Sequence, residues 1–288
     1  MIKIFKKIKG RFDRGQIVLI LVLITVVGLT IGLSLISRTI TDIRISSQIE
    51  QSSRAFSAAE AGIETALRGN IAVGPTGTVS LEGASANFAV QTLGGTSDNY
   101  NLPLTEAGNS QTVWLITHKD DNTIDESGES YPTNSIIEIC FGSKSEVTEE
   151  KAPAILVSLY YKEAAEYKVA KKAFDPYEAR DNGFDHADEL GPYCGNFLYR
   201  KKIIAHQDGD SGTVDFDIQP SSTLLLMRIQ PLYEATAITV DPERELPIQG
   251  KIISSIGQTS TGVARKIQVY QSYPVLPGLL DFTFFSEN

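Results

Sequence analysis

Two cysteines, Cys140 and Cys194, give this chain its one opportunity for a covalent cross-link. A disulfide between them would close a loop of about fifty residues and contribute roughly 3 to 4 kcal/mol on the chain-entropy model. Such bonds form and persist outside the reducing cytoplasm, so the expectation depends on where this part of the chain resides. The alternative is a pair of buried free thiols.

An acidic segment at residues 120–129 gathers hard oxygen ligands of the kind that Ca²⁺ takes. Asp120, Asn122 and Asp125 are its candidate calcium ligands. The segment lacks the alternating EF-hand spacing, because Ile124 sits where an acid is expected. Two further acidic stretches, at residues 181–189 and 208–210, are equally ambiguous. The alternative for all three is a solvated acidic loop, and no other cofactor is expected.

No arrangement of residues predicts catalysis. His118, His186 and His206 lie in separate acidic or loop-like contexts. The sequence also lacks the Gly-x-Ser-x-Gly, His-Glu-x-x-His and phosphate-binding glycine motifs. We therefore expect a protein that is not an enzyme.

The charge is unevenly divided along the chain. The whole chain carries −9, and residues 1–15, with six basic side chains and one acidic one, carry +5, which leaves −14 for residues 16–288. Such an acidic body repels a phosphate backbone. No nucleic-acid partner is indicated.

The elements that must position these residues begin with a basic leader, residues 1–15, that ends in Arg14-Gly15. An uncharged apolar run, residues 16–36, follows at once and would form a helix of roughly 30 Å, enough to cross a membrane. A secretory signal is cleaved after its apolar region, whereas the obvious processing point here precedes it. The basic leader predicts that the N-terminus stays in the cytoplasm and that the rest of the chain is exported.

The helix is expected to continue to residue 69. Apolar residues recur at spacings of three, four or seven from Ile36 to Leu67, so residues 37–69 form an amphipathic second half whose stripe can pack on the chain's own head. Gly28 and Gly32 permit close approach of another helix, although short glycine pairs also arise by chance in membrane helices. Gly69-Asn70 ends the helix.

Residues 70–288 are predicted to form an exported, β-rich head, as one large or two small domains. Runs that resemble strands are bounded by Gly, Pro, Asn or Asp, and two tight connections, at residues 82–85 and 163–166, predict hairpins. The fold class is therefore α+β: a long N-terminal membrane-spanning helix packed on an antiparallel β-rich head. The predicted strand runs are 78–81, 87–93, 112–117, 135–141, 154–161, 167–174, 197–205, 213–218, 223–231, 235–240, 251–256 and 263–270.

Two features together resemble a known family. Gly15 directly before an apolar helix is similar to the type III signal of type IV pilins and type II secretion pseudopilins. The segment Phe56-Ser-Ala-Ala-Glu-Ala-Gly62 resembles the N-terminal region of minor pilins of the PilX type. The resemblance implies cleavage by a prepilin peptidase between Gly15 and Gln16, and N-methylation of Gln16.

The resemblance also implies assembly of the subunit with other pilins or pseudopilins, on an inner-membrane assembly platform. The contacts would be made by the N-terminal helix. Its own pattern gives the packing positions: Gly28 and Gly32 permit the approach of another helix, and Phe56, Ala59 and Ile63 lie on the stripe that can pack on the head.

The chain departs from the family pattern at the start of the expected mature protein. Most family members begin with Phe or Met and carry a glutamate five residues in, where this chain has Gln16 and Ile20. No acid occurs from residue 16 until Asp42, so the ion pair to a neighbouring N-terminal amine is lost. This indicates a minor subunit in a priming or tip position.

The expectation is thus a structural minor pilin or pseudopilin. It would start as a single-pass precursor in the cytoplasmic membrane and end in a cell-surface filament or a periplasmic pseudopilus, two destinations that the sequence leaves open. The second hypothesis is a signal-anchored surface binding or adhesion protein that never polymerises, and the third is a membrane-tethered enzyme.

Overall fold

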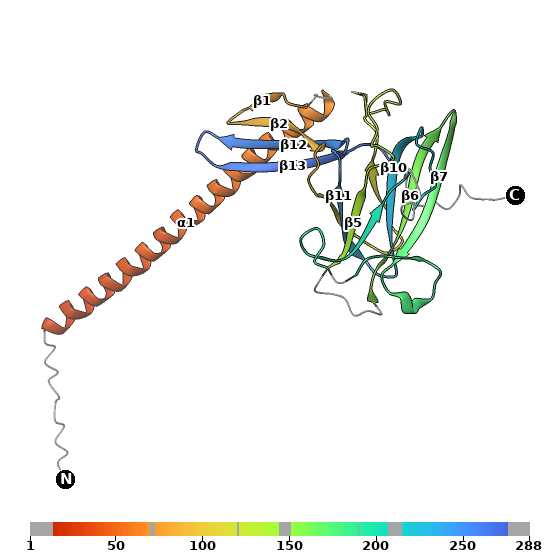
Figure 1. Cartoon of the computed structure of the whole chain (residues 1–288). Helices are drawn as coiled ribbons and strands as arrows, with labels where there is room; N and C mark the ends of the chain where they lie inside the picture. Colours follow the sequence, from red (N-terminus) through yellow and green to blue (C-terminus); the bar gives the residue numbers. More distant parts are fainter. Residues whose placement is uncertain are drawn as a thin grey trace, which may run out of the picture. The chain divides into compact units, whose positions relative to one another are not determined.

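The computed structural model describes residues 14–69, 73–119, 121–143, 151–189, 191–206 and 215–275. It has one long helix, α1 (Arg14–Arg68), followed by strands (Figure 1). The strands are β1 (Thr76–Leu81), β2 (Ala84–Gly94), β3 (Tyr100–Thr105), β4 (Gln111–Trp114), β5 (Ile137–Ser143), β6 (Ala154–Glu163), β7 (Glu166–Asp175), β8 (Asp185–His186), β9 (Phe197–Ile203), β10 (Thr223–Leu232), β11 (Thr236–Pro242), β12 (Ile248–Thr259) and β13 (Ala264–Ser272).

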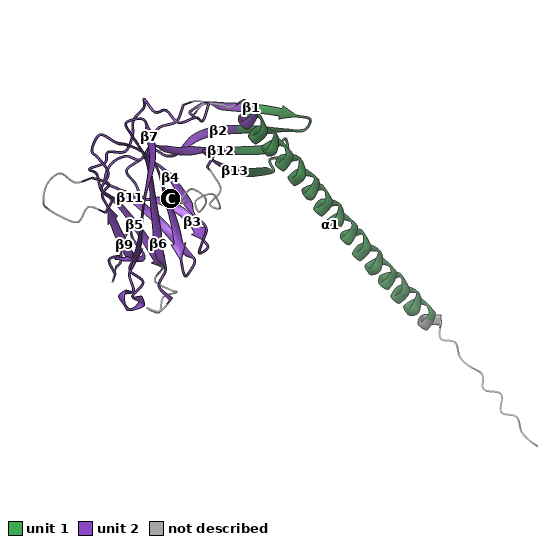
Figure 2. Cartoon of the chain, turned by 90° about the vertical axis from the view of Figure 1, so that its right-hand side faces the viewer, with its two compact units in different colours: residues 1–65, 78–87, 255–267 green, residues 66–77, 88–254, 268–288 purple. Residues whose placement is uncertain are grey.

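The predicted α+β class, with a long apolar N-terminal helix on an antiparallel β-rich head, is confirmed. Three sheets form, in the strand orders β1-β2-β12-β13, β4-β10-β6-β7-β8 and β3-β11-β5-β9. The chain divides into two compact units (Figure 2). The first contains residues 1–65, 78–87 and 255–267, and the second contains residues 66–77, 88–254 and 268–288. The helix therefore does not form a unit of its own but shares one with parts of the head.

In the first unit, the last turns of α1 pack on strands through small side chains. Ala55, Ala58, Ala59 and Gly62 are buried, at helical spacings of three and four. A β-carbon at Gly257 of β12 would lie 1.9 Å from the carbonyl oxygen of Ala55, so the helix backbone almost touches the strand. Glycine is required at such a close approach of two backbones.

In the second unit, the other two sheets share one core, as in a β-sandwich. Ile139 and Phe141 of β5 belong to the same buried cluster as Val157 of β6 and Met227 and Ile229 of β10. Along β5 the inward residues alternate with the partly exposed Glu138. The short β7–β8 pair is parallel, and the other pairs within these two sheets are antiparallel.

Both predicted hairpin connections are present, between β1 and β2 and between β6 and β7. Ala164 takes the left-handed φ of 54° in the second turn. The expected strand at 213–218 is wrong for residues 215–218, which form no strand, and residues 213 and 214 lie outside the described part. β3, which contains Pro103, is absent from the predicted strand runs. β3 is an edge strand, where a proline is tolerated.

Candidate functional site

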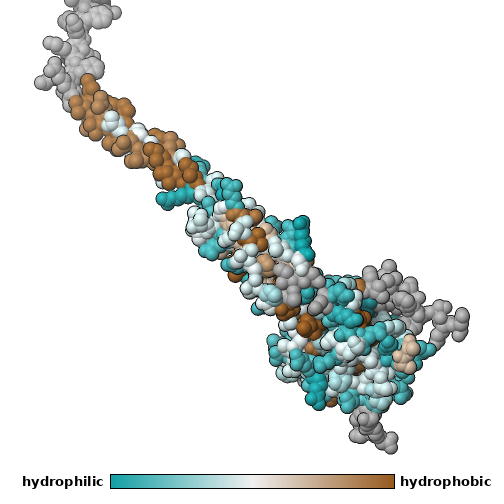
Figure 3. Space-filling view, turned by 90° about the horizontal axis from the view of Figure 1, so that it is seen from above, coloured by the Kyte–Doolittle hydropathy of each residue, from teal (hydrophilic) through white to brown (hydrophobic). Residues whose placement is uncertain are grey.

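The N-terminal half of α1 exposes an unbroken series of large apolar side chains. From Ile17 to Ile36, every large apolar side chain is between 48 and 68% exposed, and hydrophobic residues predominate on the face of this part of the helix that Figure 3 shows. By length and composition, this helix is able to cross a membrane. Threonines within it direct their hydroxyls to main-chain carbonyls of the preceding turn, as at Thr25 and Thr30, so they add little polarity.

The proposed cleavage position lies at the start of this helix. Arg14, Gly15 and Gln16 form its first turn, and residues 1–13 of the expected leader lie outside the described residues. The first charge after Arg14 is Arg38. Residues 16–37 are thus uncharged and span roughly 33 Å as a helix.

The five packing positions predicted on the helix fall into three environments. Ala59 and Ile63 are buried against the first unit's strands, at 0 and 7% exposure. Phe56 is 47% exposed and lies on another side of the helix. Gly28 and Gly32 have open space around them, because a β-carbon at either would meet nothing within 4 Å.

The buried stripe of α1 is shorter than the sequence predicts. It was expected to face the head from Ile36 onward, but Ile43, Ile45 and Ile49 are at least half exposed. Burial begins only at Ala55. Hydrophobic periodicity selected the large side chains, whereas the residues buried at the closest helix–strand contact are small ones, Ala55, Ala58, Ala59 and Gly62.

The cysteine pair expected from the sequence forms a disulfide. Cys140 lies in β5 and is fully buried, and Cys194 lies in the connection before β9, with 6.2 Å between the two α-carbons. Glu138 lies beside both sulfurs. Because the bond removes both thiolates, this cluster is a cross-link and does not offer thiolate ligands.

The acidic segment is held by hydrogen bonds within its own loop. Asp121 accepts from the N–H of Thr123 at 2.9 Å, and Asp125 accepts from the hydroxyl of Ser127 at 2.8 Å. These bonds lower the pKa of both carboxyls. Asn122 adopts a left-handed φ of 65°. Of the three calcium candidates, Asp120 lies outside the described residues, so calcium binding stays a prediction from the sequence.

The three histidines lie apart in three different settings. The His118 ring stacks on Tyr273 with 3.7 Å between centroids, and burial lowers its pKa. His186 approaches Glu178 at 3.4 Å on an exposed surface, and His206 lines a small pocket. In the described part of the chain they do not converge on a shared nucleophile.

The second unit also contains a pocket that the sequence did not predict. Tyr131 joins two of its walls by hydrogen bonds. The buried Tyr131 hydroxyl donates to the carbonyl of Ile136 at 2.7 Å and accepts from the N–H of Arg244 at 3.2 Å. The N–H of Ile136 donates to the carboxylate of Glu243 at 2.8 Å, so the β11–β12 connection is tied to the segment before β5. The walls come from parts of the chain more than a hundred residues apart, and no local motif signals them.

Comparison with known proteins adds no family assignment. No family model, curated protein or solved structure matches this chain.

Proposed function

We propose that this chain is a structural minor pilin or pseudopilin that assembles into a type IV pilus-like filament through α1. The observation that carries the proposal is the division of α1 into an exposed, charge-free N-terminal half and a short C-terminal part packed on strands. A helix of this kind can anchor a precursor in the membrane and later pack with other helices in a filament core.

The missing acid supports a priming or tip position. Ile20 stands where the family carries a glutamate, so this subunit inserts into lipid without the cost of a carboxylate. It also lacks the group that would pair with a neighbour's N-terminal amine. A subunit that needs no such partner is suited to the start or the end of a filament.

Apolar residues beyond the membrane-length segment favour assembly over permanent anchoring. Ile45, Ile49 and Phe56 are 47 to 65% exposed and lie on one side of α1, at turns of about 100° per residue. A static anchor has no use for a large apolar stripe in water, whereas a subunit that buries it against other helices does. The second candidate, a non-polymerising surface binding protein, leaves this stripe uncovered.

The proposal includes the path of the protein through the cell. The precursor would be inserted with its N-terminus inside, cleaved between Gly15 and Gln16 by a prepilin peptidase, and methylated on Gln16. The assembly platform would then move it into a surface filament or a periplasmic pseudopilus. The protein itself would catalyse no reaction.

The first test measures the N-terminal residue and the intact mass of the protein from membranes and from sheared surface material. We expect a chain that begins at Gln16 and is one methyl group heavier than the unmodified product. Gly15→Val should leave only full-length precursor, while the same change at Gly10, within the leader, should still be processed. A chain that begins at Met1 in every wild-type fraction would exclude the pilin proposal and favour the anchored binding protein.

The second test separates assembly from processing. Ile49→Ser and Phe56→Ser should be processed normally and should lower the amount of subunit in filaments. The matched control is Leu104→Ser in β3, which removes a side chain of similar exposure, 65%, from the head. Equal incorporation of all three variants would contradict a role of the exposed stripe in assembly.

A further inference from the structure

Two pockets in the second unit share a wall. One has a volume of about 740 Å³ and the other about 300 Å³, and both are lined by Ser130, Tyr131, Pro132 and Asn134. The larger volume lies in the range of small-molecule sites. The hydrogen bonds of Tyr131 to the main chain of Ile136 and Arg244 tie this shared wall to the neighbouring segments.

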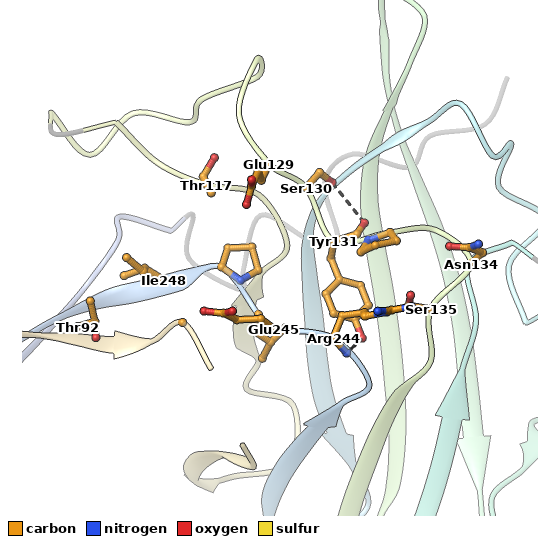
Figure 4. A pocket seen from close by; sticks show the side chains of 14 residues that line it. Thr92, Thr117, Glu129, Ser130, Tyr131, Asn134, Ser135, Arg244, Glu245 and Ile248 are labelled. Carbon is orange, nitrogen blue, oxygen red and sulfur yellow. Dashed lines mark hydrogen bonds between the residues drawn. The ribbon is translucent and has the colours of Figure 1, made fainter. Parts of the chain in front are cut away.

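The larger pocket is lined by four polar side chains that have no hydrogen-bond or ion-pair partner among the described residues. Glu129 lies on one side, and Arg244 and Glu245 lie on the other, with Asn134 toward the shared wall (Figure 4). In the part of the chain that the structure describes, these four side chains form no hydrogen bond or ion pair. Their donors and acceptors are therefore available to a ligand.

The signs of these groups select the class of ligand. An anion would meet two carboxylates, Glu129 and Glu245, and a cation would meet the guanidinium of Arg244. A hydroxyl group satisfies both kinds of partner, since it donates to a carboxylate and accepts from a guanidinium or an amide. Pro132 and Ile248 add apolar surface on which the C–H face of a ring can rest.

The smaller pocket also favours ligand hydroxyl groups, but its lining has no carboxylate or guanidinium. Apart from His206, the residues that line it are neutral, and its polar groups include the hydroxyls of Thr133, Ser222 and Thr223. Ser222 is 8% exposed, and its hydroxyl has no hydrogen-bond partner among the described residues. A buried hydroxyl without a partner is costly, and a ligand hydroxyl in this pocket would satisfy it.

We propose that the two pockets form one binding site for a neutral oligosaccharide, with adjacent sugar units in the larger and the smaller pocket. Asn134 and Pro132, which line both, would contact the linkage between them. The proposal rests on the second unit alone and does not depend on filament assembly.

The test uses the full chain in phosphocholine micelles, because sugar-headed detergents would compete. Maltotetraose, chitotetraose and mannotetraose are the neutral probes, and tetragalacturonate and tetraglucosamine are the charged comparators. Binding is measured by saturation-transfer NMR and calorimetry. We expect at least one neutral tetramer to bind with a Kd of about 1 mM or tighter and the charged ones to bind at least tenfold more weakly.

Three variants locate the binding. Asn134→Ala should weaken it about tenfold, as expected for the loss of one or two hydrogen bonds. Ser222→Ala, which removes a hydroxyl without a partner, should fold normally and weaken binding about threefold or more. Asn196→Ala is the matched control, because Asn196 is also exposed but lies in neither pocket.

Three results would overturn the proposal. The first is the absence of binding by all three neutral tetramers, and the second is a charged tetramer that binds as tightly as the best neutral one. The third is an affinity that Asn134→Ala and Ser222→Ala leave at the Asn196→Ala level. The membrane and filament assays do not enter this test, so its failure would leave the proposed function untouched.

Discussion

Gly257→Ala should separate α1 from the strand on which it packs. The added β-carbon would lie 1.9 Å from the carbonyl oxygen of Ala55 and 2.6 Å from the main-chain nitrogen of Ala59. Both atoms belong to the helix backbone, so no side chain can rotate away to make room. Because β-carbon contacts essentially never fall below 3.0 Å, the helix must move by more than 1 Å from β12.

The expected loss follows from that displacement. Overpacking of a close contact costs about 1 to 3 kcal/mol, and we expect the upper part of this range because the opposing atoms are main chain. The backbone of Gly257 does not adopt a positive φ, so the variant tests packing and not backbone strain. Gly28→Ala is the matched control, since a β-carbon there meets nothing and alanine favours the helix by up to about 1 kcal/mol.

Hydrogen exchange on the full chain in micelles measures this effect locally. In Gly257→Ala, amides of residues 58–66 should exchange about ten- to a hundredfold faster than in the wild type, while amides of β5 and β6 should be unchanged. The Gly28→Ala control should match the wild type in both regions. Unchanged protection of residues 58–66 in Gly257→Ala would refute the close helix–strand contact.

Two further predictions concern the second unit. Replacing Cys140 and Cys194 by serine should lower the free energy of unfolding by roughly 4 kcal/mol, the chain-entropy value for a separation of 54 residues, as measured by urea denaturation against the oxidised wild type. Asp241→Asn should stabilise the protein at neutral pH, because burial raises the pKa of Asp241 and the Glu138 carboxylate raises it further. The folded wild type then holds a proton that the unfolded chain has lost, so its stability falls as pH rises from 3.8 through the raised pKa. The advantage of the variant should vanish below pH 3.8, and an advantage that is equal at all pH values would contradict the assignment to this carboxyl.

The parts of the fold that depend on one local signal could be predicted from the sequence. The absence of charge from residue 16 to residue 37 predicts the exposed half of α1, and short turns such as Ala164-Ala165 predict the hairpins. β3 could not be predicted in this way, because its place at a sheet edge, which makes Pro103 acceptable, depends on its pairing with β11, more than a hundred residues later.

The candidate pocket shows a second limit of sequence reasoning. Arg244 and Glu129 are separated by more than a hundred residues in the sequence, and they line one pocket where hydrogen bonds of Tyr131 and Glu243 join two distant connections. No spacing or motif in the sequence indicates that these two loops lie side by side in the fold. The cysteine pair could be predicted because only two cysteines exist, so that only one intramolecular pairing is possible.

The placement of large and small residues on α1 follows from its distance to β12. Gly257 and Gly62 bring the helix so close that a β-carbon at Gly62 would lie 2.3 Å from the Ser255 hydroxyl. Phe56 is one residue, or about 100°, away from Ala55, so turning the helix to bury its ring would place an aromatic side chain where Ala55 now buries only a methyl group. The contact with the strand therefore excludes Phe56 and leaves it in the exposed stripe.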